Sequence, residues 1–218
     1  SSLSFMIKTV LFDLDGTLLN TLTDLSNSVN YALNSHHLPQ RTELEVRSFL
    51  GNGIHNLIEK SVPENTPSED VFQSFKSYYL QHGLESTAPY PGIISLLKAL
   101  QQKSVKMAII SNKVDTAVQQ LNKKFFSDYI GIAIGEKPQI RRKPAPDSVL
   151  LAIKALDANP ATTLYVGDSE VDYETAHSAG IRCALVTWGF RDRLDLEDLH
   201  ADYYVNSSHE LMAVISEN

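Results

Sequence analysis

Two acidic residues directly follow an apolar stretch near the start of the sequence, in the segment VLFDLDGT at residues 10–17. Burying an unpaired carboxylate is costly, so Asp13 and Asp15 must lie at the exposed end of a strand or meet a cation. There Asp13 can attack phosphorus and form an aspartyl-phosphate. Asp15 can protonate the leaving oxygen as a general acid and later activate water. With a metal ion and a lysine beside them, the two acids could carry out phosphoryl transfer.

Further polar residues follow other apolar stretches and could complete such a site. They are Ser111, Asn112, Lys143, Asp168 and Asp172. Carboxylates that converge from several loops form the hard-oxygen environment that Mg²⁺ prefers, and a lysine adds a second cation for a dianionic phosphate. We expect four residues to contact the phosphate through side chain or backbone, namely Gly16, Thr17, Ser111 and Asn112. The sequence therefore predicts a magnesium-dependent phosphotransfer site.

Simpler explanations exist for three of these residues, and the sequence leaves them open. Lys143 could lie in a solvated basic loop, since Arg141 and Arg142 precede it. Asp172 could be an acid that is favoured by the N-terminus of a helix. Ser111 could simply end a strand or cap the next helix.

The segments that must position these residues alternate between strand and helix patterns. Short apolar runs predict buried strands at residues 8–14, 105–111, 164–167 and 183–186, with a shorter one at 130–134. Apolar residues at helical spacing lie between them. Continuous apolar strands joined by helices predict an α/β protein with a parallel sheet covered on both faces. In such sheets the ligand site lies at the carboxyl ends of the strands.

Residues 21–86 interrupt this alternation with helical patterns and no convincing strand. Within them, residues 66–69 (TPSE) predict a helix start with a capping box and proline at the first helical position. The length of the region favours a small helical domain inserted after the first strand over a long helical crossover. We therefore predict a discontinuous core of residues 1–18 and 88–218, and a helical cap of residues 19–87.

Four separated segments together resemble the four motifs of the haloacid dehalogenase-like (HAD) phosphohydrolases. In order, they are DLDGT at residues 13–17, Ser111, Lys143, and GDS at residues 167–169 followed by Asp172. The resemblance implies a Rossmann-like core with an inserted helical cap, Asp13 as nucleophile and Asp15 as acid/base. It also implies Mg²⁺ bound by Asp13, the Asp15 carbonyl and Asp168. Asp172 would hold metal-bound water or orient Lys143.

Within this family the chain looks like a phosphoglycolate phosphatase or a near relative. The similarity lies in YPG at residues 90–92, RKPAP at residues 142–146 and GNG at residues 51–53 of the cap region. It implies a phosphomonoesterase for a small phosphorylated metabolite, with 2-phosphoglycolate as the first candidate. We expect residues 51–53 to form a loop over the active site. If the substrate carries a carboxylate, Arg47 or Lys60 are the candidate cap cations to bind it.

The motifs leave other functions open, because substrate choice depends on the cap. A pyrophosphatase, a nucleotide or sugar-phosphate phosphatase, and a β-phosphoglucomutase-like phosphomutase share the fold. A phosphoprotein phosphatase or a non-catalytic binding module belongs to a different class. The complete set of motif residues argues against a loss of catalysis.

The composition narrows the class of partner. The 218 residues carry a formal net charge of −7, with 43% hydrophobic and 21% charged residues. This acidic balance disfavours a nucleic acid or a membrane as the partner. No apolar run approaches the roughly 20 residues of a membrane span. The single cysteine, Cys183, indicates a reducing compartment, and we expect a cytoplasmic monomer or weak homodimer.

Overall fold

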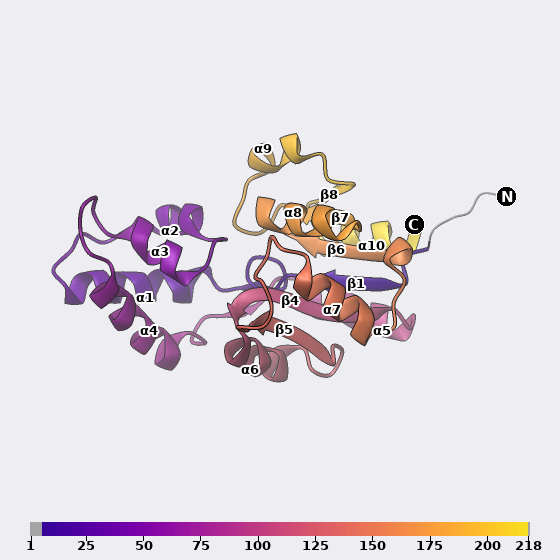
Figure 1. Cartoon of the computed structure of the whole chain (residues 1–218), viewed down its shortest axis with the longest axis horizontal. Helices are drawn as coiled ribbons and strands as arrows, with labels where there is room; N and C mark the ends of the chain where they lie inside the picture. The colour runs from indigo at the N-terminus through magenta and orange to yellow at the C-terminus, as the bar shows by residue number, and fades with distance from the viewer. Residues whose placement is uncertain (1–5, 218) are drawn as a thin grey trace. The chain divides into compact units, whose positions relative to one another are not determined.

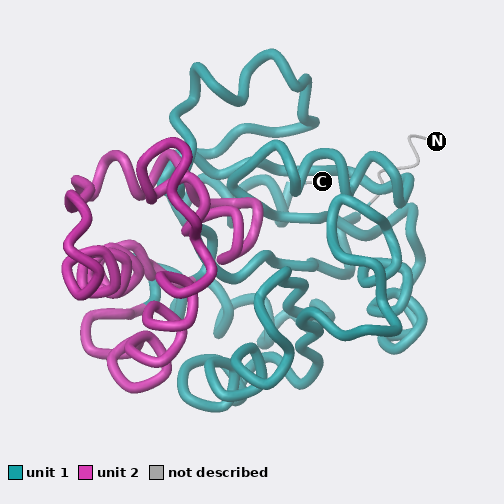
Figure 2. The backbone as a smooth tube through the Cα atoms, turned by 60° about the vertical axis from the view of Figure 1, so that its left-hand side comes forward, with its two compact units in different colours: residues 1–18, 89–218 teal, residues 19–88 magenta. Residues whose placement is uncertain are grey.

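The computed structural model describes residues 6–217. The chain divides into two compact units, which Figure 2 distinguishes by colour: unit 1 comprises residues 1–18 and 89–218, and unit 2 comprises residues 19–88. Residues 1–5 and 218, which the sequence analysis assigns to the core domain, lie outside the described residues. The division into a catalytic core and a cap stays a prediction.

Unit 1 is built on a six-stranded sheet with the order β5-β4-β1-β6-β7-β8, in which all neighbouring strands are parallel (Figure 1). The strands are β1 (Thr9–Phe12), β4 (Lys106–Val114), β5 (Ile132–Glu136), β6 (Thr163–Gly167), β7 (Arg182–Val186) and β8 (Tyr203–Val205). The predicted α/β class with a parallel sheet is confirmed.

Helices connect these strands and cover the sheet. They are α5 (Ile93–Gln102), α6 (Asp115–Phe125), α7 (Asp147–Ala155), α8 (Glu170–Ala179), α9 (Arg193–Leu196) and α10 (Ser208–Glu217). Helix α7 packs against α8, and α5 packs against α10. Figure 1 shows α7 and α8 in front of the sheet. Helices on both faces explain why the strands are apolar at successive positions rather than at alternate ones.

The core of unit 1 fixes the strands whose carboxyl ends carry the acidic residues. Leu11 of β1 and Tyr165 of β6 are partners in the parallel register, and both are fully buried. They belong to one apolar cluster with Val149 and Ala152 of α7 and Ala176 of α8. Each fully buried Leu or Val side chain contributes about 1.5–3 kcal/mol. This packing holds β1 and β6 in register, and therefore the residues that follow them.

Unit 2 is helical. Its helices are α1 (Leu22–Ser35), α2 (Glu43–Phe49), α3 (Ile54–Ser61) and α4 (Glu69–His82). Helix α1 packs against α4 and α2 through a buried stripe that includes Leu25, Val29 and Leu33. The segments that enter and leave the unit, β2 (Leu19–Asn20) and β3 (Ala88–Pro89), form a two-stranded sheet.

A buried carboxylate ties the first helix of unit 2 to the end of that unit. Asp24 of α1 is 3% exposed, and its oxygens accept hydrogen bonds from the Ser86 amide at 3.0 and 2.9 Å. The Thr87 hydroxyl donates to the same carboxylate at 2.7 Å. This contact joins residues that are more than 60 positions apart in sequence and fixes the segment before β3 against α1.

The structure corrects the predicted start of α4. The capping box at residues 66–69 is wrong: α4 begins at Glu69, its N-cap is Ser68, and the Ser68 side chain makes no capping hydrogen bond. Pro67 therefore precedes the helix instead of occupying its first turn. A capping box does occur in unit 2, at α2, where Thr42 and Glu45 exchange side chain-to-backbone hydrogen bonds. Four-residue patterns of this kind do not reveal which candidate adopts the required backbone angles.

Several strands differ from the pattern-based prediction. Strand β1 ends at Phe12, before the predicted end at residue 14, and β5 runs over Ile132–Glu136 instead of residues 130–134. Strand β8 was not predicted, because its three residues YYV are too short for a reliable apolar run. Strand β4 continues to Val114, three residues beyond the predicted end, with a shift in register against β5 between Ile110 and Val114. Polar residues 111–113 therefore belong to the last part of a strand.

Candidate active site

The carboxyl ends of three adjacent strands bring the predicted site residues together. Strands β4, β1 and β6 are neighbours in the sheet. Asp13 follows β1, Ser111 lies near the end of β4, and Asp168 follows β6. The Asp13 amide donates to the Val166 carbonyl at 2.9 Å, which continues the β1–β6 pairing to the nucleophile candidate.

Three carboxylates form a compact cluster at this edge. Asp13, Asp168 and Asp172 each offer one oxygen, and these oxygens all lie within 4.8 Å of one another. Asp168 and Asp172 are 1% and 0% exposed, whereas the Asp13 side chain retains 15% exposure. Three anions this close together require compensating positive charge. Their oxygens are the donor type that a hard divalent cation such as Mg²⁺ takes.

Lys143 supplies one positive charge within the cluster. Its ammonium lies 2.9 Å from Asp172 Oδ1 and 3.2 Å from Asp13 Oδ1. It also donates to the Tyr165 hydroxyl at 2.7 Å and to the Ile110 carbonyl at 3.1 Å. The Lys143 side chain is only 3% exposed. The solvated-loop explanation for this lysine therefore does not describe its position.

The cluster shifts the ionisation of its members. Burial disfavours the charge on Lys143, but Asp13 and Asp172 outweigh it and raise the pKa of the ammonium. Burial and repulsion by Asp172 raise the pKa of Asp13 well above its usual range. The same two causes raise the pKa of Asp168 to about 7. A bound cation would favour the ionised form of both carboxylates.

Asp172 is held by donors on both oxygens. Its Oδ1 accepts from Lys143 and from the Tyr165 hydroxyl at 2.6 Å. Its Oδ2 accepts from the Asp168 and Ser169 amides at 2.9 and 3.3 Å and completes the capping box of α8. Burial raises the pKa of Asp172, but Lys143 and the hydrogen bonds lower it below the ordinary value. This geometry suits a residue that orients Lys143, and the same residue caps the helix.

Asp168 is oriented by the loop that follows β1 and by a later loop. Its Oδ1 accepts from the Thr17 hydroxyl at 3.2 Å, and its Oδ2 accepts from the Phe190 amide at 3.0 Å. Thr17 is fully buried. Its hydroxyl, a candidate for phosphate binding, thus contacts a carboxylate in this structure and has a positioning role there.

The backbone at Gly16 leaves no room for a side chain. Its φ is +84°, a left-handed conformation that glycine adopts without strain. A Cβ at this position would lie 2.4 Å from Asp168 Oδ2. Gly16 therefore lets the loop pass against the carboxylate cluster.

Asp15 lies beside a different lysine. The Lys113 ammonium is 3.3 and 3.4 Å from the two oxygens of Asp15. The two side chains keep 11% and 21% of their surface exposed, respectively. The acid/base candidate thus has a cationic partner that the sequence analysis did not assign.

Ser111 and Asn112 shape the backbone around the two lysines. The Asn112 side chain donates to the Lys143 carbonyl at 2.9 Å and accepts from the Lys143 amide at 2.8 Å. Ser111 Oγ accepts from the Lys113 amide at 3.0 Å. Asn112 therefore fixes the loop of Lys143. Ser111 is 5% exposed, and phosphate binding by Ser111 and Asn112 stays a prediction.

The predicted cap residues lie in unit 2. Gly51 and Gly53 have φ values of +116° and +88°, and Gly53 is the N-cap of α3. Arg47 lies in the last turn of α2 and Lys60 in the last turn of α3. Their roles toward a substrate stay predictions.

Tyr165, Lys113 and Trp188 were missed by the sequence analysis. Tyr165 had a weak signal, since a phenol in an otherwise apolar buried strand needs a hydrogen-bond partner. Trp188 donates from Nε1 to the Thr17 carbonyl at 2.9 Å and so supports the loop that carries the acids. The only sequence feature that pointed to Lys113 was its position near the end of a predicted strand.

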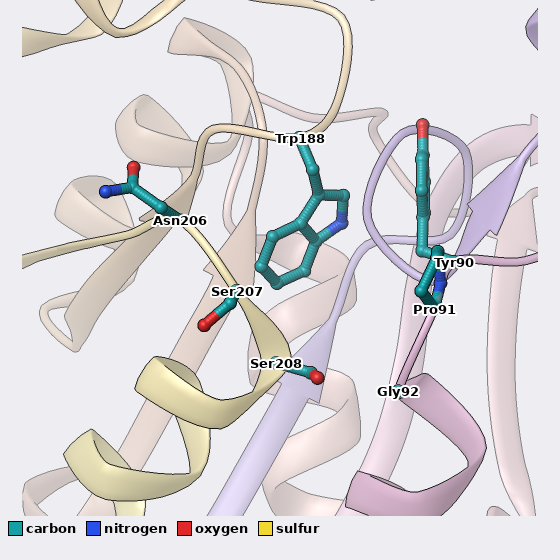
Figure 3. Close-up of a pocket in the computed structure, with 7 residues that line it drawn as sticks. All are labelled: Tyr90, Pro91, Gly92, Trp188, Asn206, Ser207 and Ser208. Atoms are coloured by element: carbon teal, nitrogen blue, oxygen red, sulfur yellow. The ribbon is translucent and has the colours of Figure 1, made fainter.

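Trp188 also borders a separate hollow of unit 1, with a volume of about 380 Å³. Figure 3 shows its indole between the starts of α5 and α10. The lining residues are Tyr90, Pro91, Gly92, Trp188, Asn206, Ser207 and Ser208. No carboxylate lines this hollow, so it is distinct from the aspartate cluster.

Within residues 6–217, no helix has the length and apolar character needed to cross a membrane.

The profile of the family described as haloacid dehalogenase-like hydrolase matches residues 10–186. A phosphoglycolate phosphatase of Aquifex aeolicus (strain VF5) is 32% identical over 189 residues, which cover 84% of this chain and 86% of that protein. The pyrophosphatase PpaX of Bacillus cereus (strain B4264) is 30% identical over 215 residues, which cover 96% of this chain and 97% of that protein.

A solved structure shows the same similarity. A Lactobacillus delbrueckii subsp. bulgaricus protein that is proposed to be a phosphoglycolate phosphatase superposes with a TM-score of 0.91 and 33% identity, covering 98% of this chain and 100% of that one. The predicted family resemblance is confirmed. The chain belongs to the haloacid dehalogenase-like hydrolase family, in its phosphoglycolate phosphatase-like subgroup.

Proposed function

We propose that this hydrolase is a Mg²⁺-dependent phosphomonoesterase that cleaves a small phosphorylated metabolite, with 2-phosphoglycolate as the first candidate. The observation that carries the proposal is the buried lysine between two carboxylates. Lys143 contacts Asp13 at 3.2 Å and Asp172 at 2.9 Å, and Asp168 completes the carboxylate cluster. Such an arrangement can hold an anionic nucleophile beside an anionic phosphate.

The residues present fit a magnesium ion. Asp13, Asp168 and the carbonyl of Asp15 would hold it, while Asp172, which accepts a hydrogen bond from the Lys143 ammonium at 2.9 Å, would orient that lysine. The cation would offset the repulsion between carboxylates and phosphate and polarise the P–O bonds. Its identity as Mg²⁺ rests on the all-oxygen donor set.

The proposed reaction consists of two successive displacements at phosphorus, in which Asp13 is first the nucleophile and then the leaving group. In the first, a carboxylate oxygen of Asp13 attacks phosphorus, the bond from phosphorus to the leaving oxygen breaks, and protonated Asp15 gives that oxygen its proton. In the second, ionised Asp15 takes a proton from water as the water attacks the aspartyl-phosphate. Inorganic phosphate departs, Asp13 is regenerated, and Asp15 is again protonated.

Unit 2 is proposed as the cap that selects the substrate and excludes water during the reaction. Its chain enters and leaves through the paired segments β2 and β3. Arg47, Lys60 and residues 51–53 are its candidate substrate contacts. The protein is further proposed to act in the cytoplasm, where the buried free thiol of Cys183 would stay reduced.

Pyrophosphate is the second candidate substrate, because a relative named as a pyrophosphatase is 30% identical over 96% of the chain. The deciding experiment measures phosphate release, with and without Mg²⁺, from 2-phosphoglycolate, pyrophosphate, a nucleotide and a sugar phosphate. A clear peak of kcat/KM on one of the first two supports the corresponding substrate. A peak of kcat/KM on another compound would support the mechanism but exclude both 2-phosphoglycolate and pyrophosphate as the substrate.

Asp13→Asn serves as the matched blank in the same experiment. The amide is a poor nucleophile, so turnover is expected to fall by at least about 10³-fold while the fold persists. Near-normal turnover of this variant, once contaminating phosphatases are excluded, would overturn Asp13 as the nucleophile. Transfer of phosphate to a sugar with little free phosphate would instead identify a phosphomutase.

A further inference from the structure

The two candidate substrates share a chemical feature beyond the phosphoryl group. When 2-phosphoglycolate is cleaved, the leaving group is glycolate, whose carboxylate lies one carbon from the leaving oxygen. When pyrophosphate is cleaved, the leaving group is phosphate, whose anionic oxygens share a phosphorus atom with the leaving oxygen. Each leaving group thus carries negative charge close to the oxygen that Asp15 protonates. A site that prefers such substrates needs a cation there.

Lys113 is the cation that contacts Asp15. Its ammonium lies 3.3 and 3.4 Å from the two carboxylate oxygens. Because the proposed mechanism places Asp15 at the leaving oxygen, Lys113 lies next to the leaving group. An ammonium carries three donors and can hold two anions at once.

Local structure holds Lys113 at this position. It lies near the end of β4, where the register against β5 shifts between Ile110 and Val114. The Lys113 amide donates to Ser111 Oγ at 3.0 Å. The side chain is largely buried, with 11% exposure, so its charge acts in a partly desolvated site where it attracts an anion more strongly than in water.

The neighbouring cations of unit 1 are held elsewhere. Lys143 is 3% exposed and lies among Asp13, Asp172 and Tyr165. Three other cations pair with acids of their own: Lys137 with Asp115 at 3.5 Å, Arg142 with Glu136 at 3.9 Å, and Arg191 with Glu170 at 3.0 Å. None of the three acids Asp115, Glu136 and Glu170 belongs to the carboxylate cluster or is the acid/base candidate.

We propose that Lys113 determines specificity by binding the negative charge of the leaving group, so that the protein selects phosphoesters and phosphoanhydrides with an anionic leaving group. The inference rests on the proposed function. It assigns leaving-group selection to strand β4 of unit 1, in addition to whatever unit 2 contributes.

The test compares two substrates of similar size, 2-phosphoglycolate and 2-hydroxyethyl phosphate, in which a neutral hydroxymethyl group replaces the carboxylate. The readout is the ratio of their kcat/KM values. Comparing this ratio between variants cancels the difference in intrinsic reactivity of the two leaving groups. For Lys113→Met we expect the ratio to fall at least about 10-fold, as the loss of a charge-assisted hydrogen bond predicts. Lys113→Arg keeps the positive charge and should retain most of the wild-type ratio.

Lys106→Met is the matched control, because Lys106 is the first residue of the same strand and donates to the carbonyls of Leu156 and Asp157. Its ratio should equal that of the wild type. Melting temperatures with and without Mg²⁺ establish that each variant is folded and binds the metal.

The outcomes separate the inference from the proposed function. If the wild type hydrolyses neither substrate nor pyrophosphate in a Mg²⁺-dependent way, the proposed function fails. If the wild type is active and Lys113→Met lowers both kcat/KM values equally, Lys113 only positions Asp15, and the inference alone is overturned. If Lys113→Met is fully active and its ratio of kcat/KM values equals that of the wild type, the inference is overturned as well.

Discussion

The ammonium of Lys143 lies 2.9 Å from the carboxylate of Asp172, and both side chains are almost completely buried, at 3% and 1% exposure. Asp172 is the third residue of α8 and also completes the capping box of that helix. The start of α8 therefore fixes a lysine that a loop delivers from between β5 and α7. A buried ion pair of this kind depends on both partners, because a single partner would leave an uncompensated charge.

Asp172→Asn should lower kcat/KM by about 10- to 100-fold, the usual effect of removing a partner that orients a site residue. The amide keeps the size of the side chain but removes the charge that holds Lys143. The measurement is steady-state phosphate release, together with a Mg²⁺ titration of the melting temperature. Because Asp172 is proposed to orient Lys143 and not to bind the metal, Mg²⁺ affinity should change less than activity.

Glu170→Gln is the control for this variant, since Glu170 lies in the same first turn of α8 and pairs with Arg191. It should retain wild-type kcat/KM. If Asp172→Asn and Glu170→Gln behaved alike, the contact between Asp172 and Lys143 would have no role in turnover. Loss of all Mg²⁺ binding in Asp172→Asn would make Asp172 a direct ligand.

Asp168 should make the stability of the metal-free protein depend on pH. Burial and Asp172 raise its folded-state pKa to about 7, so the folded protein binds this proton more tightly than the unfolded chain does. Its contribution to stability is fully present below the unfolded pKa near 4 and is lost as the pH rises to about 7. In EDTA, the melting temperature of Asp168→Asn relative to the wild type should therefore increase between about pH 5 and pH 7.5.

Magnesium should restore the stability that the metal-free wild type loses near neutral pH, because a ligand that binds only the folded state stabilises that state. The melting temperature should rise with Mg²⁺ in the wild type and stay constant in Asp168→Asn. Asp147→Asn is the control: Arg141 lowers the pKa of Asp147, so this group does not titrate in the measured range. A flat difference between Asp168→Asn and the wild type across the pH range would contradict the assigned ionisation.

The sheet and the cluster of acids were predictable because each is a local signal repeated along the chain. Apolar runs end at Asp13, Ser111 and Asp168, and adjacency of parallel strands then brings these ends together. The hydrogen bonds and ion pairs between these strand ends were not predictable, because they depend on side-chain contacts between residues far apart in sequence. The Thr17 hydroxyl is an example, since sequence cannot distinguish a contact with phosphate from its observed contact with Asp168.

Lys113 and Tyr165 illustrate the same limit. Alternation along β6 places Tyr165 in the apolar core beside Leu11, yet its hydroxyl reaches Lys143 and Asp172. Lys113 was recognisable as a polar residue at a strand end, but its pairing with Asp15 follows from the extension of β4 and its register shift. The wrong helix start at residues 66–69 has a related cause, since capping depends on backbone angles that several serine and threonine positions could satisfy.

Asp24 should be the most sensitive acidic residue of unit 2 for stability. Asp24→Asn removes the charge and replaces one of the two acceptor oxygens with an NH2 group, so the Ser86 amide and the Thr87 hydroxyl lose their charge-assisted hydrogen bonds to the carboxylate. The expected loss is about 1–3 kcal/mol, which for a chain of this size lowers the melting temperature by about 2–4 °C for each kcal/mol. Asp70→Asn is the matched control, because Asp70 also lies in a first helical turn but is exposed. Its stability should stay within about 0.5 kcal/mol of the wild type, and thermal melts of both variants that coincide would show that Asp24 does not tie the segment before β3 to α1.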